Sequence, residues 1–315
     1  MTKTIAILLL FFSSLSILAQ DSNALLKLFK NALTSIENTE YKWVIERTFE
    51  PNDDMLDSLK IEYEAKINAV DPKDPQAAAK IAEHKKQWDI RKSIFGVQRK
   101  KKIEVALSYL NPQEWFARQI FFDKNIAITN DYYCSKSGVT SVVIERDLSV
   151  NVYHDAKNTL SVIASGQLLF DIEHLMDRIE RINIDSEKGG DYKLKIELKN
   201  YGYFIANVDK TTFFPKYLCH YYAADRKGFE AKVLSTGKSE MEEALPNRVS
   251  FTRFTHDGKH VDYQDDWKAI SIRPIIDPSS VKTDYQFKPG YQVTILSGPK
   301  TITVRSDELI KRNKK

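Results

Sequence analysis

Residues 189–222 decide the fold, and they read GGDYKLKIELKNYGYFIANVDKTTFFPKYLCHYY. Apolar and polar side chains alternate over 192–198, and further strand-like runs follow at 201–209 and 214–222, a pattern typical of strands with one buried face. Glycine, asparagine and aspartate stand in the connections between these runs. Short connections join antiparallel strands, because a parallel neighbour needs a crossover of a dozen residues or more. The stretch therefore predicts an antiparallel sheet that grows one strand at a time.

The same alternation extends toward both ends of the chain, and the full set comes to about ten strands, within the usual range for one large sheet. The clearest hairpin signal is His256-Asp257-Gly258, because Asp-Gly between two apolar runs favours a tight turn. Gly298-Pro299 marks a further turn near the end of the chain. The other strands are expected at residues 103–109, 115–129, 139–153, 229–234, 249–254, 261–267, 291–295 and 302–304.

Helices are expected at three places. Apolar residues recur at helical spacing from Leu25 to Ile36 and again from Leu168 to Ile182, with charged residues on the opposite side. Asp74-Pro75 resembles an N-cap followed by proline at the first helical position, which predicts a third helix inside an insertion at about 71–95.

Residues 41–69 allow two interpretations. Alternating residues at 41–49 and 59–69, separated by a turn-like Pro-Asn-Asp-Asp, predict a hairpin of two long strands. The second run also fits a helical stripe that begins at Leu59 and ends at Val70. We take the hairpin as the prediction and keep the helix as the alternative.

Together these elements predict an α+β fold, in which about three helices pack on or in a large curved antiparallel β-sheet, a half-open β-barrel. No Pro/Gly/Ser-rich linker divides the chain. Residues 20–315 are therefore expected to form a single β-rich envelope domain that carries the helical insertion at about 71–95.

The first residues have the order of a secretory signal peptide. Lys3 precedes an apolar run from Ile5 to Leu18, and Ala19 offers a small residue at the cleavage site. The run of roughly 14 residues is too short for a spanning helix, which needs ~20. We expect residues 1–19 to be removed, no transmembrane segment to remain, and the mature chain to be periplasmic or secreted.

The charge pattern gives no reason to expect nucleic acid as a partner. The chain has 47 basic and 43 acidic residues, a formal charge of +4, and the two signs are interspersed. The one basic run, Arg99-Lys100-Lys101-Lys102, is read as a solvated strand guarded by charge, with contact to phosphate or anionic lipid as the alternative.

Two cysteines, Cys134 and Cys219, remain in the mature chain. An even count in an oxidising compartment permits one disulfide. The alternative is two separately buried thiols that act as small apolar side chains. Both interpretations stay open from the sequence.

No catalytic residues, metal site or cofactor can be assigned. The chain lacks the spacings of the common nucleophile, phosphate-binding and zinc motifs. His256, Asp257, His260 and Asp262 come nearest to a metal cluster, but Asp-Gly places them in a turn, so an exposed polar turn is the preferred reading. The remaining candidates are more simply solvated or packed side chains, and they are Asp265-Asp266, Glu240, Glu242, Glu243, His154 and His220.

Aromatic residues concentrate in the predicted strands, often as adjacent pairs such as Tyr132-Tyr133, Phe213-Phe214 and Tyr221-Tyr222. Adjacent residues of a strand point to opposite faces of the sheet. A strongly curved sheet could wrap one aromatic face into an apolar groove. The alternative is that both faces are ordinary core, covered by helices and loops.

The order of elements resembles the periplasmic lipoprotein-carrier family, the LolA/LolB-like group, and also the sensor domain of RseB-like envelope-stress regulators. Three short segments are similar to strand and turn positions of that family, and they are residues 209–216 (DKTTFFPK), 245–249 (LPNRV) and 287–293 (FKPGYQV). The insertion at 71–95 and the basic tail 311–315 depart from it. The resemblance implies a half-open barrel whose concave side is plugged by helices, and it transfers no ligand-contacting residue.

We therefore expect an exported, non-enzymatic binding protein whose apolar concave face accepts a lipid or the lipidated end of another protein. Trp43, Trp115, Phe122 and Phe204 are the predicted lining, and each is an equally good core residue. A second hypothesis is an interaction or sensor domain that reads a protein partner through the inserted helix. A third is a secreted hydrolase with a site assembled from loops.

Overall fold

The computed structural model describes residues 22–34, 36–123, 126–143, 149–153, 156–164, 167–238, 244–297 and 300–312. Several sequence predictions fall outside these ranges and stay predictions. They are the signal peptide at 1–19 with its cleavage site, the polar residues His154, Glu240, Glu242 and Glu243, and the turn at Gly298-Pro299.

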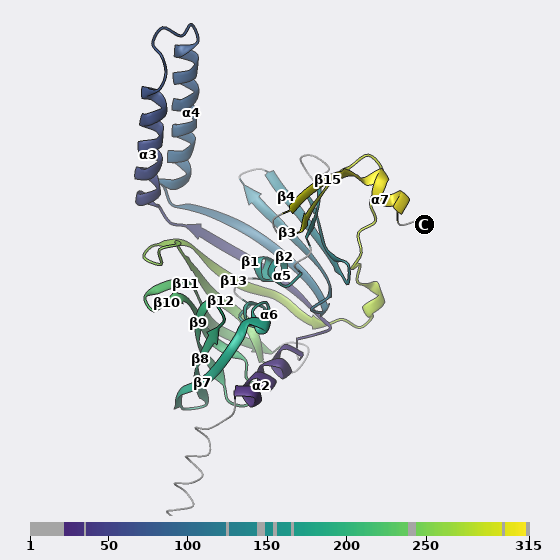
Figure 1. The fold of residues 1–315 in the computed structure, drawn as a ribbon. Helices are drawn as coiled ribbons and strands as arrows, with labels where there is room; N and C mark the ends of the chain where they lie inside the picture. The colour runs from purple at the N-terminus through teal and green to yellow at the C-terminus, as the bar shows by residue number, and fades with distance from the viewer. Residues whose placement is uncertain are drawn as a thin grey trace, which may run out of the picture.

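All fifteen described strands belong to one sheet, which does not close on itself (Figure 1). Neighbouring strands are antiparallel except β14 and β6, which run parallel. From edge to edge the order is β15 (Lys300–Arg305), β14 (Gln292–Ser297), β6 (Ser149–Tyr153), β5 (Gly138–Val143), β4 (Ile126–Ser135), β3 (Glu114–Asp123), β2 (Arg99–Asn111), β1 (Thr39–Phe49), β13 (Val261–Pro274), β12 (Ala244–Phe254), β11 (Arg226–Lys238), β10 (Pro215–Ala223), β9 (Gly202–Asp209), β8 (Asp191–Leu198) and β7 (Ile179–Lys188). The predicted α+β class with a large curved, mainly antiparallel sheet is confirmed.

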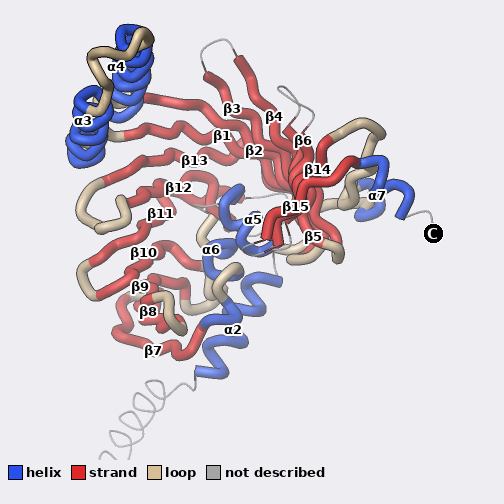
Figure 2. The backbone as a smooth tube through the Cα atoms, turned by 45° about the horizontal axis from the view of Figure 1, so that its top comes forward, coloured by secondary structure: helices blue, strands red, loops and turns tan. Residues whose placement is uncertain are grey.

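Three helices lie on the concave side of this sheet, and a pair of helices projects away from it (Figure 2). The first group is α2 (Ser22–Thr34), α5 (Ala156–Ala164) and α6 (Leu169–Glu173), and the projecting pair is α3 (Asp53–Asn68) and α4 (Ala77–Phe95). A last helix, α7 (Ser306–Arg312), follows β15, and two single 3₁₀ turns occur at Met176–Arg178 and Pro278–Ser280. The predicted N-terminal amphipathic helix is confirmed, because Leu25 and Phe29 of α2 are buried.

The core lies between the concave face and these three helices. Alternate residues of β1, namely Tyr41, Trp43 and Ile45, are buried, while the residues between them are more exposed. β2 repeats the pattern with Ile103, Val105, Leu107 and Tyr109. This period of two is what a strand with one covered face produces.

The predicted strand at 59–69 is wrong, and the helical alternative is right. Residues 53–68 form α3, whose first turn is capped by the Asn52 side chain accepting from the Met55 N–H. Tyr63 of α3 stacks on Trp88 of α4 at 5.5 Å. β1 already pairs with β2 on one side and β13 on the other, so residues 59–69 had no place beside it. The insertion is therefore a helical hairpin, and it contains the helix predicted from Asp74-Pro75.

The long helix predicted at 168–182 is also wrong. Only the five residues of α6 are α-helical there, and a 3₁₀ turn then leads into β7. Ile182 pairs with Ile196 of β8. Ile182 faces the core from β7, and its position happens to continue the apolar spacing of α6. The sequence pattern therefore could not show where the helix ends.

The strand count is higher than the ten or so expected, mainly because two predicted runs were each two strands. Residues 115–129 divide into β3 and β4, and residues 139–153 divide into β5 and β6. The hairpin of β12 and β13 around Gly258 is confirmed. Gly258 has φ +74°, and a Cβ there would lie 2.7 Å from the backbone nitrogen of Lys227.

Cys134 and Cys219 are both free and buried. The structure therefore agrees with two separate thiols and not with a disulfide. Cys134 lies in β4 and Cys219 in β10, and strands β3, β2, β1, β13, β12 and β11 stand between them. Burial raises the pKa of the Cys134 thiol to about 12, because a thiolate would be poorly solvated there. Both residues serve as small apolar side chains.

Candidate functional site

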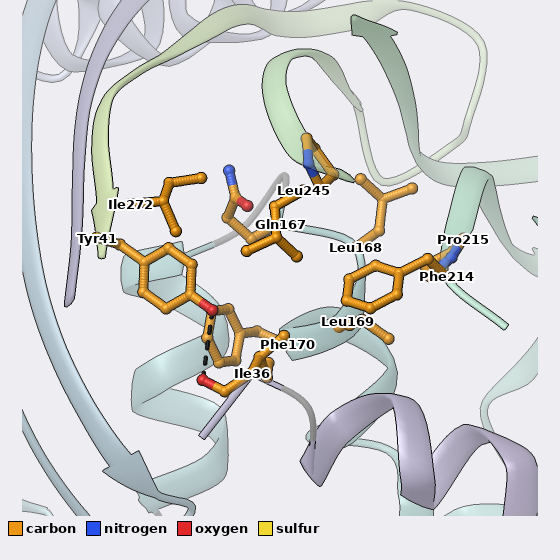
Figure 3. A pocket seen from close by; sticks show the side chains of 11 residues that line it. Ile36, Tyr41, Gln167, Leu168, Leu169, Phe170, Phe214, Pro215, Leu245 and Ile272 are labelled. Atoms are coloured by element: carbon orange, nitrogen blue, oxygen red, sulfur yellow. Dashed lines mark hydrogen bonds between the residues drawn. The ribbon is translucent and has the colours of Figure 1, made fainter. Parts of the chain in front are cut away.

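An apolar hollow lies between α6 and the concave face of the sheet (Figure 3). Its space is about 360 Å³ when the part open to solvent is counted, but the side chains leave room inside for only about one water molecule. The lining consists of Ile36, Tyr41, Gln167, Leu168, Leu169, Phe170, Phe214, Pro215, Leu245, Pro246 and Ile272. We call this set the inner hollow.

Helix α6 forms one wall of the inner hollow. Its Phe170 ring meets Tyr41 edge-on at 6.0 Å and Tyr109 at 5.0 Å between ring centroids. Such edge-to-face pairs stabilise beyond the apolar area they bury. Five residues are too few for a helix to be stable by itself, so α6 keeps its place through these contacts.

The turn between β9 and β10 forms the second wall, and its geometry follows from Asp209. One Asp209 carboxylate oxygen accepts the backbone N–H groups of Thr211 at 2.8 Å and Thr212 at 3.0 Å, which lowers the pKa of Asp209. Phe213 takes the left-handed φ of +59° and points into the core. Phe214 therefore turns toward the inner hollow.

The remaining wall comes from strand ends near the same edge. Leu245 and Pro246 lie at the start of β12, and Ile272 lies near the end of β13. The Tyr41 hydroxyl donates to the backbone oxygen of Ile36 at 3.4 Å, drawn in Figure 3. Gln167 adds an amide to this otherwise aliphatic and aromatic lining. Such a lining matches an apolar chain with a polar group at its end, which would enter only if side chains of α6 moved aside.

Glu173, the last residue of α6, places an ionisable carboxyl group in the core beside this site. Its carboxyl is buried, and the Oε1 atom has no hydrogen-bond partner within the described part of the chain. Burial raises the pKa of Glu173 to about 7, an effect that Lys157 opposes and that Asp177 and Glu37 reinforce. The helix that walls the inner hollow thus ends in a buried carboxyl group with a raised pKa.

The four predicted lining residues are not brought together. Trp43, Trp115 and Phe204 are buried in the helix-covered core and do not reach the inner hollow. Phe122 is on the opposite face, because it is an odd number of residues from Trp115 in the same strand. Its ring lies 5.2 Å from the Lys102 ammonium. The structure thus places the four residues apart, and a role for any of them in ligand binding stays a prediction.

The sequence did contain a signal for the residues that line the inner hollow. Two of the three segments quoted for the family resemblance, residues 209–216 and 245–249, supply Phe214, Pro215, Leu245 and Pro246 to the inner hollow. Each joins a turn or a strand start to a proline. A search for apolar residues at strand ends, rather than strand centres, would have found them.

The polar residues weighed as metal ligands or catalytic groups make contacts that support the fold. Asp257 accepts from the Lys259 backbone N–H at 3.0 Å inside the β12–β13 turn. His220 is buried, its Nε2 lies 2.8 Å from the Tyr201 carbonyl oxygen, and burial lowers its pKa to about 4. Within the described ranges, no three His, Cys, Asp or Glu residues gather as a metal site would require.

The two adjacent aspartates of β13 are engaged in ion pairs on opposite faces. Asp265 is buried and accepts two hydrogen bonds from Arg47, at 2.8 and 2.7 Å. Asp266 pairs in the same bidentate way with Arg248 at the surface. Both carboxylates are therefore already paired with a guanidinium group.

No protein-family model matches the chain, and no curated protein matches its sequence. Solved structures do share its fold. The chain is similar to a DUF1329 family protein from Desulfovibrio piger, with TM-score 0.51 and 10% identity over 84% of this chain and 97% of that one.

Two further solved structures are similar at lower scores. One is a putative outer membrane lipoprotein-sorting protein domain from Vibrio parahaemolyticus, with TM-score 0.48 and 8% identity over 81% of this chain and 94% of the other. The other is the LolA superfamily protein NE2245 from Nitrosomonas europaea, with TM-score 0.42 and 9% identity over 84% and 99%.

Among the helices that the structure describes, none combines the length and apolar character needed to cross a membrane.

Proposed function

We propose that this chain is an exported, non-enzymatic binding protein that takes an acyl chain, or the lipidated end of another protein, into the inner hollow. The ligand would lie between α6 and the concave face of the sheet. The signal peptide expected at residues 1–19 supports a periplasmic or secreted location. The resemblance to the lipoprotein-carrier family supports the same class of ligand.

The observation that carries the proposal is the inner hollow itself. Its walls are aliphatic and aromatic, and the wall formed by α6 is a five-residue helix held by side-chain packing. An acyl chain that displaces Leu168, Leu169 and Phe170 would replace one set of apolar contacts by another. Each CH₂ group that it buries contributes about 0.8 kcal/mol, so several carbons would offset the loss of these contacts.

Native mass spectrometry of the mature protein, purified from its own envelope, tests the proposal. We expect a bound fatty acid, phospholipid or lipidated protein, identified after organic extraction. Ile272→Trp should fill the inner hollow and abolish the bound mass. Ile205→Trp is the matched control, because the same change on the outward side of β9 leaves the hollow intact. An unliganded mass that no added lipid shifts would overturn the proposal.

A second candidate function rests on the projecting hairpin of α3 and α4. No residue of α4 is buried, and Ile61 and Ile90 are 69% and 50% exposed. Exposed isoleucines on a projecting arm suit a protein partner. Phe49 and Arg99 pair across β1 and β2, so a short Gly-Asn turn could replace residues 50–98 without disturbing the sheet. If the arm is the recognition element, this deletion abolishes capture of a partner and leaves lipid binding unchanged.

A further inference from the structure

The outer face of the sheet carries a second and larger space, an open groove of about 630 Å³. That volume falls in the range of roughly 300–1,000 Å³ found for small-ligand sites. Its residues include Glu40, Phe116, Arg118, Tyr133, Arg273 and Lys282. We call it the outer groove, and it is separate from the inner hollow because the sheet lies between them.

The wall of the outer groove is the connection that leaves β13 and returns to β14. These two strands are far apart in the sheet, with β1–β6 between them, so residues 275–291 must pass over several strands. Tyr285 anchors this connection against Tyr133 of β4 at 5.3 Å, and Phe287 packs on Tyr285 at 5.4 Å. The groove is therefore built by packed aromatic side chains and does not depend on a loose loop.

The floor is aromatic. Phe116 of β3 and Tyr133 of β4 are cross-strand neighbours with ring centroids 5.1 Å apart. Both rings lie on the outer side, since Trp115 and Cys134 beside them are buried in the core. The two rings are inclined to each other by 55°, and together they give the polar groove an apolar floor.

Two guanidinium groups are fixed above this floor. Arg118 donates through Nε and Nη2 to Asp131 at 2.6 and 2.7 Å, and Asp131 is buried with 4% of its side chain exposed. Arg273 donates through Nε to Glu40 at 2.7 Å. No other hydrogen bond of either guanidinium occurs among the described residues, so Nη1 of Arg118 and both Nη atoms of Arg273 remain as oriented donors.

Charges around the outer groove balance. Three cationic side chains face three carboxylates, and these are Arg118, Arg273 and Lys282 against Glu40, Asp131 and Asp277. A free anion gains little where each fixed guanidinium already has its carboxylate. A hydroxyl group both donates and accepts, so a ligand with adjacent hydroxyls can bond the guanidinium and the carboxylate of one ion pair together.

We propose that the outer groove binds a neutral oligosaccharide. The sugar rings stack on Phe116 and Tyr133, and their hydroxyl groups bond Arg273 with Glu40 and the free edge of Arg118. A site with oriented polar donors discriminates strongly against ligands that lack the matching hydroxyls. This site is independent of an acyl ligand in the inner hollow.

Titration calorimetry and a glycan array with the full mature chain test this inference. The array holds neutral oligosaccharides, with chitotriose, cellotriose and maltotriose as the soluble probes, and inorganic phosphate and a sialylated sugar as anionic probes. We expect saturable binding of at least one neutral oligosaccharide. Arg273→Gln and Tyr133→Leu should each weaken it at least tenfold.

Tyr203→Leu is the matched control. Tyr203 stacks on Tyr221 at 5.0 Å on the same face of the sheet but lies in β9, outside the outer groove. This variant should bind as the wild type does, and all three should keep the wild-type melting temperature within a few degrees. The proposal is overturned if no neutral sugar binds, if binding survives both groove variants, or if the groove variants abolish only the binding of an anionic probe.

Discussion

The inner hollow and the outer groove are built from neighbouring residues of the same two strands. Tyr41 of β1 pairs with Ile272 of β13 and lines the inner hollow, whereas Glu40 pairs with Arg273 one position away and lines the outer groove. One residue of shift exchanges an apolar pair for an ion pair, because successive side chains of a strand point to opposite faces. The two strands thus set the position of both sites. The alternation of side chains between the two faces sets the chemistry of each site.

The largest expected effect comes from shortening a side chain on the inner face of the sheet. Trp43→Ala should lower the free energy of unfolding by about 3–5 kcal/mol, since a fully buried indole is removed and a cavity remains. The neighbouring Val44→Ala on the outer face should cost about 1 kcal/mol or less. Urea unfolding measures both. Similar losses for the two would show that both faces are core.

The second test uses pH and the carboxyl group at the end of α6. Burial raises the pKa of Glu173 from its ordinary 4.5 to about 7, so the folded state holds the proton more tightly than the unfolded state. The contribution of Glu173 to stability is therefore fully favourable below pH 4.5 and is lost as the pH rises toward and past 7.

Glu173→Gln should remove this dependence and stabilise the protein at pH 8 by up to about 3 kcal/mol, with little change at pH 4. Chemical unfolding at the two pH values measures the effect. Asp177→Asn is a suitable comparison, because Lys157 holds the pKa of the exposed Asp177 below its ordinary value. An equal gain for Glu173→Gln at both pH values would contradict the expectation.

A third and smaller effect is expected at the ion pair of the outer groove. Arg118→Gln leaves the carboxylate of Asp131 buried without its charged partner, which costs about 1–3 kcal/mol. The Arg118 side chain is 47% exposed, and solvent reduces the loss toward the lower end. Thermal unfolding with and without 0.5 M salt would show a loss that changes little with salt if Asp131 stays desolvated.

The smallest effect is expected at the surface pair of Arg248 and Asp266. Both side chains are substantially exposed, so Arg248→Gln should cost only about 0.2–1 kcal/mol, and added salt should remove most of it. Equal costs for Arg248→Gln and Arg118→Gln would mean that the burial of Asp131 contributes nothing to the outer pair.

Strands with a regular alternation were predictable, and the sites at their ends were not. Tyr192–Leu198 and the β12–β13 hairpin follow directly from alternation and from Asp-Gly turn chemistry. Residues 59–69 matched both periods, and only the pairing of β1 with β2 and β13 decides for the helix. Local patterns carry no information on which strands become neighbours.

The inner hollow was missed for a similar reason. Its lining joins residues 36, 41, 167–170, 214–215, 245–246 and 272, which meet only through the order of strands in the sheet. Large aromatic residues at strand centres, such as Trp43 and Trp115, attracted the prediction because size and hydrophobicity mark core and ligand sites alike. The outer groove likewise depends on where the connection after β13 crosses the sheet.

The central pairing of β1 with β13 has a consequence for how the chain reaches its native state. Thr39 pairs with Pro274, so the two halves of the sheet join only after nearly the whole chain is available. A polypeptide threaded across a membrane from its N-terminus would expose the bonding edge of β1 and the aromatic concave face until β13 emerges. Such non-local closure slows folding and lengthens the period in which the chain can aggregate. If the chain is exported as proposed, its folding should depend on holding chaperones, and a circular permutant that begins at β13 should depend on them less.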